Sequence, residues 1–247
     1  WTGDIPFVRC ESCGLTYQNP QPLQDDLSRR YDSDYFSYEK ENEEAFFTLM
    51  RLGLQDVGFD ELVKGLPPSF MDVGCATGLL LAEMKSRGFS EQGVEICAPA
   101  AEFGRRTRGV AIHTGTLEEA AFGDESFGVI HCSHLIEHLT DPVSFVREVR
   151  RLLVPGGLFL VTTPDIQGFQ SLLFRERWRS AIHDHMVLFS RHSLGRLLKE
   201  AGFRVLKRRS WGGLARGSAP APLKAAADRI CKILNQGDVM ILAARRS

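Results

Sequence analysis

The sequence predicts an α/β fold with a seven-stranded, mainly parallel sheet, an antiparallel edge strand and helices on both faces. First, short apolar segments alternate with amphipathic segments along most of the chain, which is typical of strands and helices in turn. Second, the apolar segments are nearly continuous, as in parallel strands that are buried on both sides. Third, 247 residues with 43% hydrophobic and 25% charged side chains are an ordinary globular composition, able to bury a full core without disulfide or metal staples.

The elements are expected in a regular order after an N-terminal helix over residues 32–58. Pro67 and Pro68 end that first region. Strands are expected at 69–73, 92–96, 110–113, 127–132, 158–162, 204–209 and 238–244, and helices at 79–87, 99–106, 143–153, 193–201 and 222–234. Because the last two strands are not joined by a regular long crossover, the antiparallel strand is expected among them.

Composition divides the chain and limits its partners. Residues 1–30 contain many turn formers and little periodicity, so we expect a small N-terminal segment followed by one domain over 31–247. Residues 171–247 carry 16 basic and 5 acidic side chains, whereas residues 1–60 carry 5 and 12. This asymmetry fits an anionic small molecule, or simply solvated charges that face the acidic N-terminal third. Few aromatic side chains accompany the basic ones, which makes nucleic acid an unlikely partner.

Targeting signals are not evident. The chain has no run of about 18 apolar residues, and its first residues lack the basic and then apolar order of a signal peptide. We therefore expect a cytoplasmic protein without a membrane partner. The sequence does not indicate an oligomeric state.

A glycine-containing turn joins the first predicted strand of the sheet to a helix. Gly74 and Gly78 let the backbone approach a ligand closely, and the helix start offers free N–H groups. The dinucleotide fingerprint would need glycine at 74, 76 and 79, but Ala76 and Leu79 stand there, so an NAD-dependent oxidoreductase or epimerase is the alternative reading. Glu95 ends the second strand, where a carboxylate accepts both hydroxyls of a ribose.

These residues resemble the class I S-adenosylmethionine-dependent methyltransferases, whose fold is Rossmann-like. Residues 72–78 resemble the first motif of that family, with Ala76 in place of its middle glycine, and residues 152–157 resemble the turn into its fifth strand. The resemblance covers most of residues 30–247 and implies methyl transfer from S-adenosylmethionine to a small-molecule acceptor, with O, N and C all open. A catalytically idle cofactor-binding protein is the alternative outside the enzymes. The cofactor-binding residues that the resemblance implies are Tyr35, Asp72, Gly74, Cys75, Ala76, Gly78, Glu95, Ile96, Thr116, Leu117, Cys132 and Ser133.

Histidines supply the candidates for a base, which we take to be His183, His185 or His134. The resemblance implies that the insert with His183 and His185 shapes the acceptor site. In an extended segment these two side chains point oppositely, so only one is expected to face the site. His134, Glu137 and His138 share one face of a short helix, but the order His-Glu-x-x-His of metalloproteases is missing. We interpret this second group as a loop that caps the cofactor pocket.

Cys10 and Cys13 are the only cysteines with an informative spacing. Cys-x-x-Cys followed by Gly14 resembles one half of a zinc ribbon, and some similar methyltransferases carry a second such pair upstream. This predicts a structural zinc ion in the intact protein, with Cys10 and Cys13 as two of its ligands. A redox pair is disfavoured because no helix is expected directly after Cys13.

Overall fold

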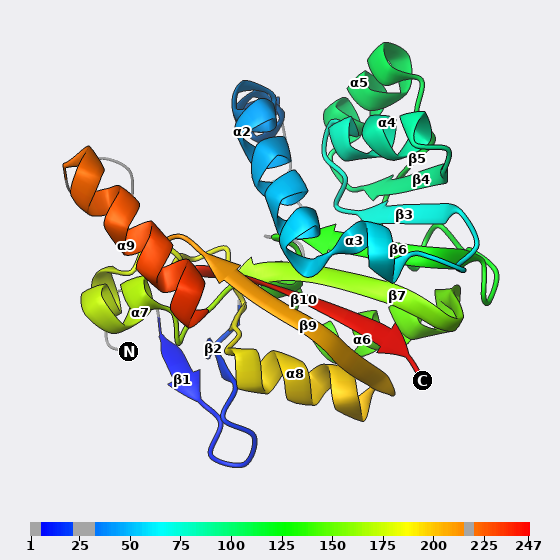
Figure 1. The fold of residues 1–247 in the computed structure, drawn as a ribbon. Helices are drawn as coiled ribbons and strands as arrows, with labels where there is room; N and C mark the ends of the chain where they lie inside the picture. The colour runs from blue at the N-terminus through cyan, green and yellow to red at the C-terminus, as the bar shows by residue number, and fades with distance from the viewer. Residues whose placement is uncertain (1–5, 22–32, 215–219) are drawn as a thin grey trace.

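The computed structural model describes residues 6–21, 33–214 and 220–247 (Figure 1). Its main sheet is built from β3 (Ser69–Val73), β4 (Ser90–Glu95), β5 (Ile112–Thr114), β6 (Phe127–Ser133), β7 (Leu153–Pro164), β9 (Phe203–Trp211) and β10 (Val239–Arg246). The strand order is β5-β4-β3-β6-β7-β10-β9. The predicted α/β class and the seven strands are therefore confirmed.

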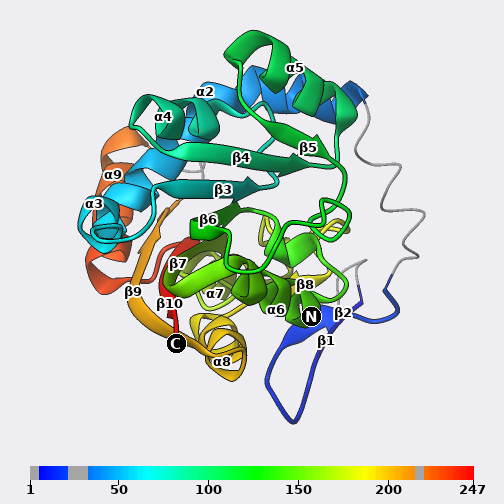
Figure 2. The same cartoon turned by 90° about the vertical axis from the view of Figure 1, so that its right-hand side faces the viewer.

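Six of the seven strands run in the same direction and one, β10, runs against them. β5, β4, β3, β6 and β7 pair in parallel, and β10 is antiparallel to both β7 and β9 (Figure 2). The antiparallel strand thus lies one position inside the edge, and β9 forms the edge itself. Burial agrees with this order, because residues 239–244 are all buried, whereas only Phe203 and Ser210 of β9 are buried.

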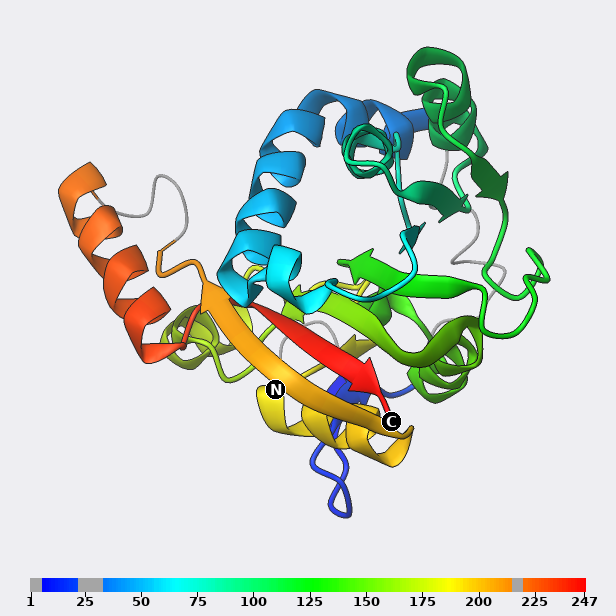
Figure 3. The same ribbon diagram turned by 45° about the vertical axis from the view of Figure 1, so that its right-hand side comes forward.

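Helices cover both faces of the sheet (Figures 1 and 3). On one face, α2 (Ser33–Val57), α4 (Leu79–Ser86) and α5 (Ala98–Arg108) enclose a core that includes Leu54, Leu81 and Phe70. On the other face, α6 (Pro142–Leu152) and α8 (Arg191–Glu200) enclose a second core that includes Phe145 and Leu198. The remaining helices are short α3 (Phe59–Leu62), α7 (Phe169–Phe174), and α9 (Ala221–Leu234), which contacts β9.

A second, small sheet joins the N-terminal segment to the insert that follows β7. It contains β1 (Phe7–Arg9), β2 (Thr16–Gln18) and β8 (Val187–Leu188) in the order β1-β2-β8, and all pairs are antiparallel. Phe7, Trp178 and Leu188 form a separate apolar cluster beside it. These two- and three-residue strands were not expected from the sequence, because they are too short to show a period.

None of the helices within the described ranges is both long and apolar enough to cross a bilayer.

Candidate functional site

The turn between β3 and α4 has the backbone shape that its glycines allow. Gly74 and Gly78 have φ values of 73° and 74°, in the left-handed region. Ala76 lies there as well, with φ 46°, at the position where the family motif has its middle glycine. The N–H groups of Gly74 and Cys75 both donate to the carbonyl of Val94, at 2.8 and 3.2 Å, so the turn is tied to the end of β4.

Glu95 is the last residue of β4, and its carboxylate lies beside the glycine turn at the carboxyl ends of the parallel strands. It is 3% exposed, and its two oxygens accept hydrogen bonds from the N–H groups of Ala76 and Cys97, each at 2.8 Å. Burial raises the pKa of Glu95, and the two N–H donors oppose that rise. Each oxygen keeps a lone pair, so the fixed carboxylate is able to accept ribose hydroxyls.

Several predicted cofactor residues have side chains that lie inside the protein. Cys75, Leu117 and Cys132 belong to the two hydrophobic cores, so only their backbone is available to a ligand. Asp72 accepts a hydrogen bond from His131 at 2.7 Å, and both are buried. Burial raises the pKa of Asp72, against the influence of the nearby imidazole. Asp72 therefore braces β3 against β6 rather than facing solvent.

Other predicted cofactor residues lie nearer the surface. Ile96 is exposed, and Thr116 and Ser133 are partly buried. The N–H of Thr116 donates to Glu119 at 2.7 Å, which supplies a carboxylate next to the position where the family often has an acid. All three lie at or just after the carboxyl ends of parallel strands, where such sheets bind ligands.

Helix α2 covers the glycine turn and adds carboxylates that the sequence analysis did not single out. Glu43 accepts hydrogen bonds from Thr77 at 2.9 Å and from Arg108 at 2.7 Å, which fix the helix to the start of α4 and to α5. One turn earlier, Glu39 shares a hydrogen bond with Tyr35. Burial, and next the charge of Glu95, raise the pKa of Glu39 to about 7. Residues 35, 39 and 43 are four positions apart and so lie on one face of the helix, and this spacing is the sequence signal that could have identified Glu39 and Glu43.

A cluster of histidines surrounds Glu137 in the short helix η1 (Ile136–His138), just after β6. Glu137 is 1% exposed; one oxygen is 3.2 Å from Nδ1 of His134, and the other accepts from Thr163 at 2.9 Å. Burial opposes ionisation, but the hydrogen bond and charge of His134 lower the pKa of Glu137 to about 2. The His134 side chain is half exposed and so faces outward from this buried carboxylate.

The insert after β7 brings one of its two histidines into this cluster. His185 is buried, and its ring meets that of His138 edge to face at 4.7 Å between centroids. Burial lowers the pKa of His185 to about 4, although the charge of Glu137 opposes the change. His183 is exposed. Of the two, His185 is thus buried and His183 is not. That one of them faces the acceptor site, and the assignment of a base, stay predictions.

The N-terminal cysteines lie in a tight turn between β1 and β2. The N–H of Gly14 donates to the carbonyl of Cys10 at 2.9 Å, and Sγ of Cys10 lies 3.1 Å from Oγ of Ser12. The hydrogen bond with Ser12 lowers the pKa of Cys10 to about 7. Within residues 6–21, 33–214 and 220–247, no third His, Cys, Asp or Glu joins the two thiols in a metal-binding group. The structural zinc ion stays a prediction for the intact protein.

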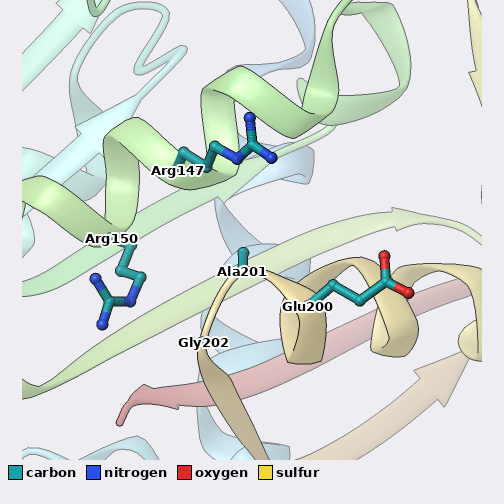
Figure 4. A pocket seen from close by; sticks show the side chains of 5 residues that line it. All are labelled: Arg147, Arg150, Glu200, Ala201 and Gly202. Atoms are coloured by element: carbon teal, nitrogen blue, oxygen red, sulfur yellow. The ribbon is translucent and has the colours of Figure 1, made fainter.

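A shallow pocket lies at the other end of the strands, where β7 and β9 begin. It is lined by Arg147 and Arg150 of α6 and by residues 200–202 at the end of α8 (Figure 4). Both helices end there, next to the starts of β7 and β9. Because ligands of parallel sheets bind at the carboxyl ends of the strands, this pocket is not the candidate site.

Comparison with known proteins agrees with this geometry. The family model described as a methyltransferase domain matches residues 42–208. A ubiquinone biosynthesis O-methyltransferase of Parvibaculum lavamentivorans is 32% identical over 142 residues, which cover 54% of this chain and 52% of that protein. One of the same name from Ruegeria pomeroyi is 29% identical over 173 residues, covering 64% and 67%. This chain thus spans about half to two thirds of the length of these relatives.

Solved structures show the same fold. A SAM-dependent methyltransferase from Archaeoglobus fulgidus is 18% identical and superposes with a TM-score of 0.62, covering 86% of this chain and 99% of that one. The fold, the strand order and the glycine turn all point the same way as the family model, which matches well over half of the residues. This chain belongs to the S-adenosylmethionine-dependent methyltransferases.

Proposed function

We propose that the protein transfers the methyl group of S-adenosylmethionine to a hydroxyl oxygen of a small-molecule acceptor. The observation that carries the cofactor assignment is Glu95, held by two backbone N–H groups beside the left-handed turn at Gly74. This arrangement offers a carboxylate to a ribose and a backbone without a Cβ to the remainder of the cofactor. When bound, the cofactor supplies a methyl group that its sulfonium charge has already activated.

Two observations support oxygen as the acceptor atom: the names of the relatives, and the pairing of His134 with Glu137. Both curated relatives carry the name O-methyltransferase. In this chain, His134 pairs through Nδ1 with the buried carboxylate of Glu137, which leaves Nε2 to take a proton from an acceptor hydroxyl. Glu137 then stabilises the imidazolium that forms. Glu43 of α2 keeps that helix over the turn through Thr77 and Arg108, and so limits access of water to the reacting groups.

The test is an assay of the purified protein with methyl-labelled S-adenosylmethionine and matched pairs of phenols and anilines. We expect methylated phenol, and we expect His134→Asn to lower kcat by about 10²–10⁴-fold while the affinity for S-adenosylhomocysteine is unchanged. His192→Asn is the matched control, because this exposed histidine of α8 is not one of the candidate bases. Methylation of the anilines alone contradicts the oxygen assignment, and binding of NAD in place of S-adenosylhomocysteine contradicts the cofactor assignment.

We also propose that the acceptor is an anion, as the basic last third of the chain predicts. Several basic side chains of the last third form ion pairs, among them Arg179 with Asp238, Arg191 with Asp165 and Lys232 with Asp56. These pairs reduce the field available to attract an anion. An anionic acceptor is supported if kcat/KM falls as the ionic strength rises, and a flat profile contradicts it.

A further inference from the structure

Helix α2 places the carboxylate of Glu39 beside the glycine turn. Tyr35, Glu39 and Glu43 are four positions apart, so their side chains lie on one face of the helix. Glu43 fixes that face on the turn, because it accepts hydrogen bonds from Thr77 at 2.9 Å and from Arg108 at 2.7 Å. Glu39, one helical turn earlier, is partly buried on the same side of α2.

Two groups of the candidate site act on Glu39 from different strands. Burial raises the pKa of Glu39 to about 7, and the charge of Glu95, at the end of β4, adds to that rise. The hydrogen bond with Tyr35 and the charge of His134, just after β6, oppose it. Glu39 is thus close both to the carboxylate that is expected to hold the ribose and to the candidate base.

The basic side chains nearest to this face of α2 are paired with another carboxylate. Lys40 and Arg108 both form ion pairs with Glu43. Within the part of the chain that the structure describes, the hydrogen bond of Glu39 is with the neutral phenol of Tyr35. A partly buried carboxylate close to another carboxylate is costly unless a cation is paired with it. Such a group beside a binding site indicates that a cation of the ligand completes the arrangement.

S-adenosylmethionine carries a cation at the required place. Its sulfur is bonded to the ribose end on one side and to the transferred methyl group on another. With the ribose at Glu95 and the methyl group directed toward His134, the sulfonium lies between these two residues. S-adenosylhomocysteine has the same ribose, adenine and amino-acid end, but its sulfur is neutral. A carboxylate beside the sulfur therefore distinguishes the two molecules by charge alone.

We propose that Glu39 makes the protein bind S-adenosylmethionine more tightly than S-adenosylhomocysteine, by placing a negative charge beside the sulfonium. This rests on the proposed function, since His134 marks the side of the acceptor. Because the positive charge disappears with the methyl group, the carboxylate favours replacement of the spent cofactor by a fresh one. It stabilises the bound cofactor more than the transition state, in which the sulfur has already lost part of its charge.

The experiment measures binding without turnover, by isothermal titration calorimetry of the full chain at pH 8. The ligands are S-adenosylmethionine, S-adenosylhomocysteine and sinefungin, in which an amino group supplies a positive charge near the position of the sulfonium. Glu39→Gln is expected to weaken binding of the two cationic ligands about 5–20-fold, as for an ion pair in a partly buried site, and to change that of S-adenosylhomocysteine less than about twofold. Equal losses for S-adenosylmethionine and S-adenosylhomocysteine, or no loss for either, overturn the proposal.

Control variants separate the charge of Glu39 from the position of the helix. Glu41→Gln, at an exposed position of α2, should change none of the affinities. Glu43→Gln loosens α2 from the turn and Glu95→Ala removes the ribose acceptor, so each should weaken S-adenosylmethionine and S-adenosylhomocysteine alike. A parent protein that binds neither ligand refutes the cofactor assignment itself, which is a different result from equal losses in Glu39→Gln.

The dependence on pH is a second test that the parent protein supplies. Protonation of Glu39 removes its charge, so the preference for S-adenosylmethionine over S-adenosylhomocysteine should increase from pH 6 to pH 8, and more steeply in the parent than in Glu39→Gln. The other ionisable groups around Glu39 are present in both proteins and cancel in this comparison; they are Tyr35, Lys40, Glu43, Glu95, Arg108 and His134. The same pH dependence in both proteins overturns the proposal.

Discussion

At the scale of single residues, the candidate site is defined by three buried carboxylates that are stabilised in different ways. Glu95 is held by two backbone N–H groups, Asp72 by His131, and Glu137 by His134 and Thr163. Only Glu95 has two backbone N–H donors, and a rotation of a neighbouring side chain does not remove these donors. It is therefore the carboxylate best suited to hold a ligand in a fixed position.

Glu95→Ala is expected to weaken binding of S-adenosylhomocysteine by about 1.5–3 kcal/mol, or roughly 10–100-fold in Kd. The variant removes the ribose acceptor and also leaves the N–H groups of Ala76 and Cys97 without their partner. Isothermal titration calorimetry measures the effect, and Glu102→Ala, at an exposed position of α5, is the control. Equal affinities of Glu95→Ala and the parent protein contradict the ribose assignment.

Glu39 is expected to make stability depend on pH. Its pKa of about 7 lies above the ordinary value of 4.5, so the folded state binds this proton more tightly than the unfolded chain does. The resulting stabilisation is complete below pH 4.5 and is lost as the pH rises through 7. Glu39→Gln removes this dependence. At pH 8 the variant should be more stable than the parent by about 1–2 kcal/mol, after allowance for solvent screening, and at pH 4 it should have no advantage.

Thermal unfolding at several pH values measures this difference, since each kcal/mol corresponds to about 2–4 °C in Tm for a chain of this size. Glu41→Gln, at an exposed position of the same helix, is the control. A difference between Glu39→Gln and the parent that stays constant from pH 4 to pH 8 contradicts the prediction.

At the scale of elements, sequence reasoning succeeded where the signal is local. The strand at 69–73 and the glycine turn were predicted because apolar residues, glycines and a helix start follow one another within ten positions. The place of β10 inside the edge was not predicted, because it depends on which of two late strands buries both faces. The same holds for His185 beside His138, since no pattern within the insert indicates which of its histidines turns inward.

The two glycines of the β3–α4 turn are expected to differ in their tolerance of a methyl group. Both have positive φ, which costs roughly 1–2 kcal/mol for alanine. At Gly78 a Cβ would also lie 2.9 Å from Cγ2 of Val110 and 3.1 Å from Cδ1 of Ile112, whereas at Gly74 it would meet only Leu135, at an ordinary 3.5 Å. Gly78→Ala should therefore destabilise the protein by about 1–3 kcal/mol more than Gly74→Ala.

Urea unfolding compares these variants, with Gly123→Ala in an exposed loop as the control. Equal losses of stability in Gly74→Ala and Gly78→Ala would show that α4 shifts to make room for the methyl group. Cofactor affinity should fall in both variants, because both distort the turn that Glu95 holds.

At the scale of the whole molecule, the N-terminal segment supports the insert that carries His185. β2 pairs with β8, and Trp178 of the insert donates to Asp238 beside the start of β10. The insert is thus fixed from two distant parts of the chain. This long-range arrangement could not be predicted from the sequence, because the residues that meet are more than 50 positions apart and share no periodic pattern.

Gln18 is the residue through which this support is expected to be measurable. It is 4% exposed, and Nε2 donates to the carbonyls of His183 and His185, both at 2.8 Å. Gln18→Ala leaves these carbonyls without their donor, which should cost about 1–3 kcal/mol of stability. Hydrogen exchange should quicken in peptides that span residues 180–189, because the insert opens more readily when the side-chain hydrogen bonds of Gln18 are lost. Gln55→Ala, on the exposed side of α2, should change neither quantity. If exchange in the insert is the same in Gln18→Ala and the parent, the Gln18 side chain has no part in holding the insert, and the backbone pairing of β2 with β8 and the bond from Trp178 to Asp238 hold it without that side chain.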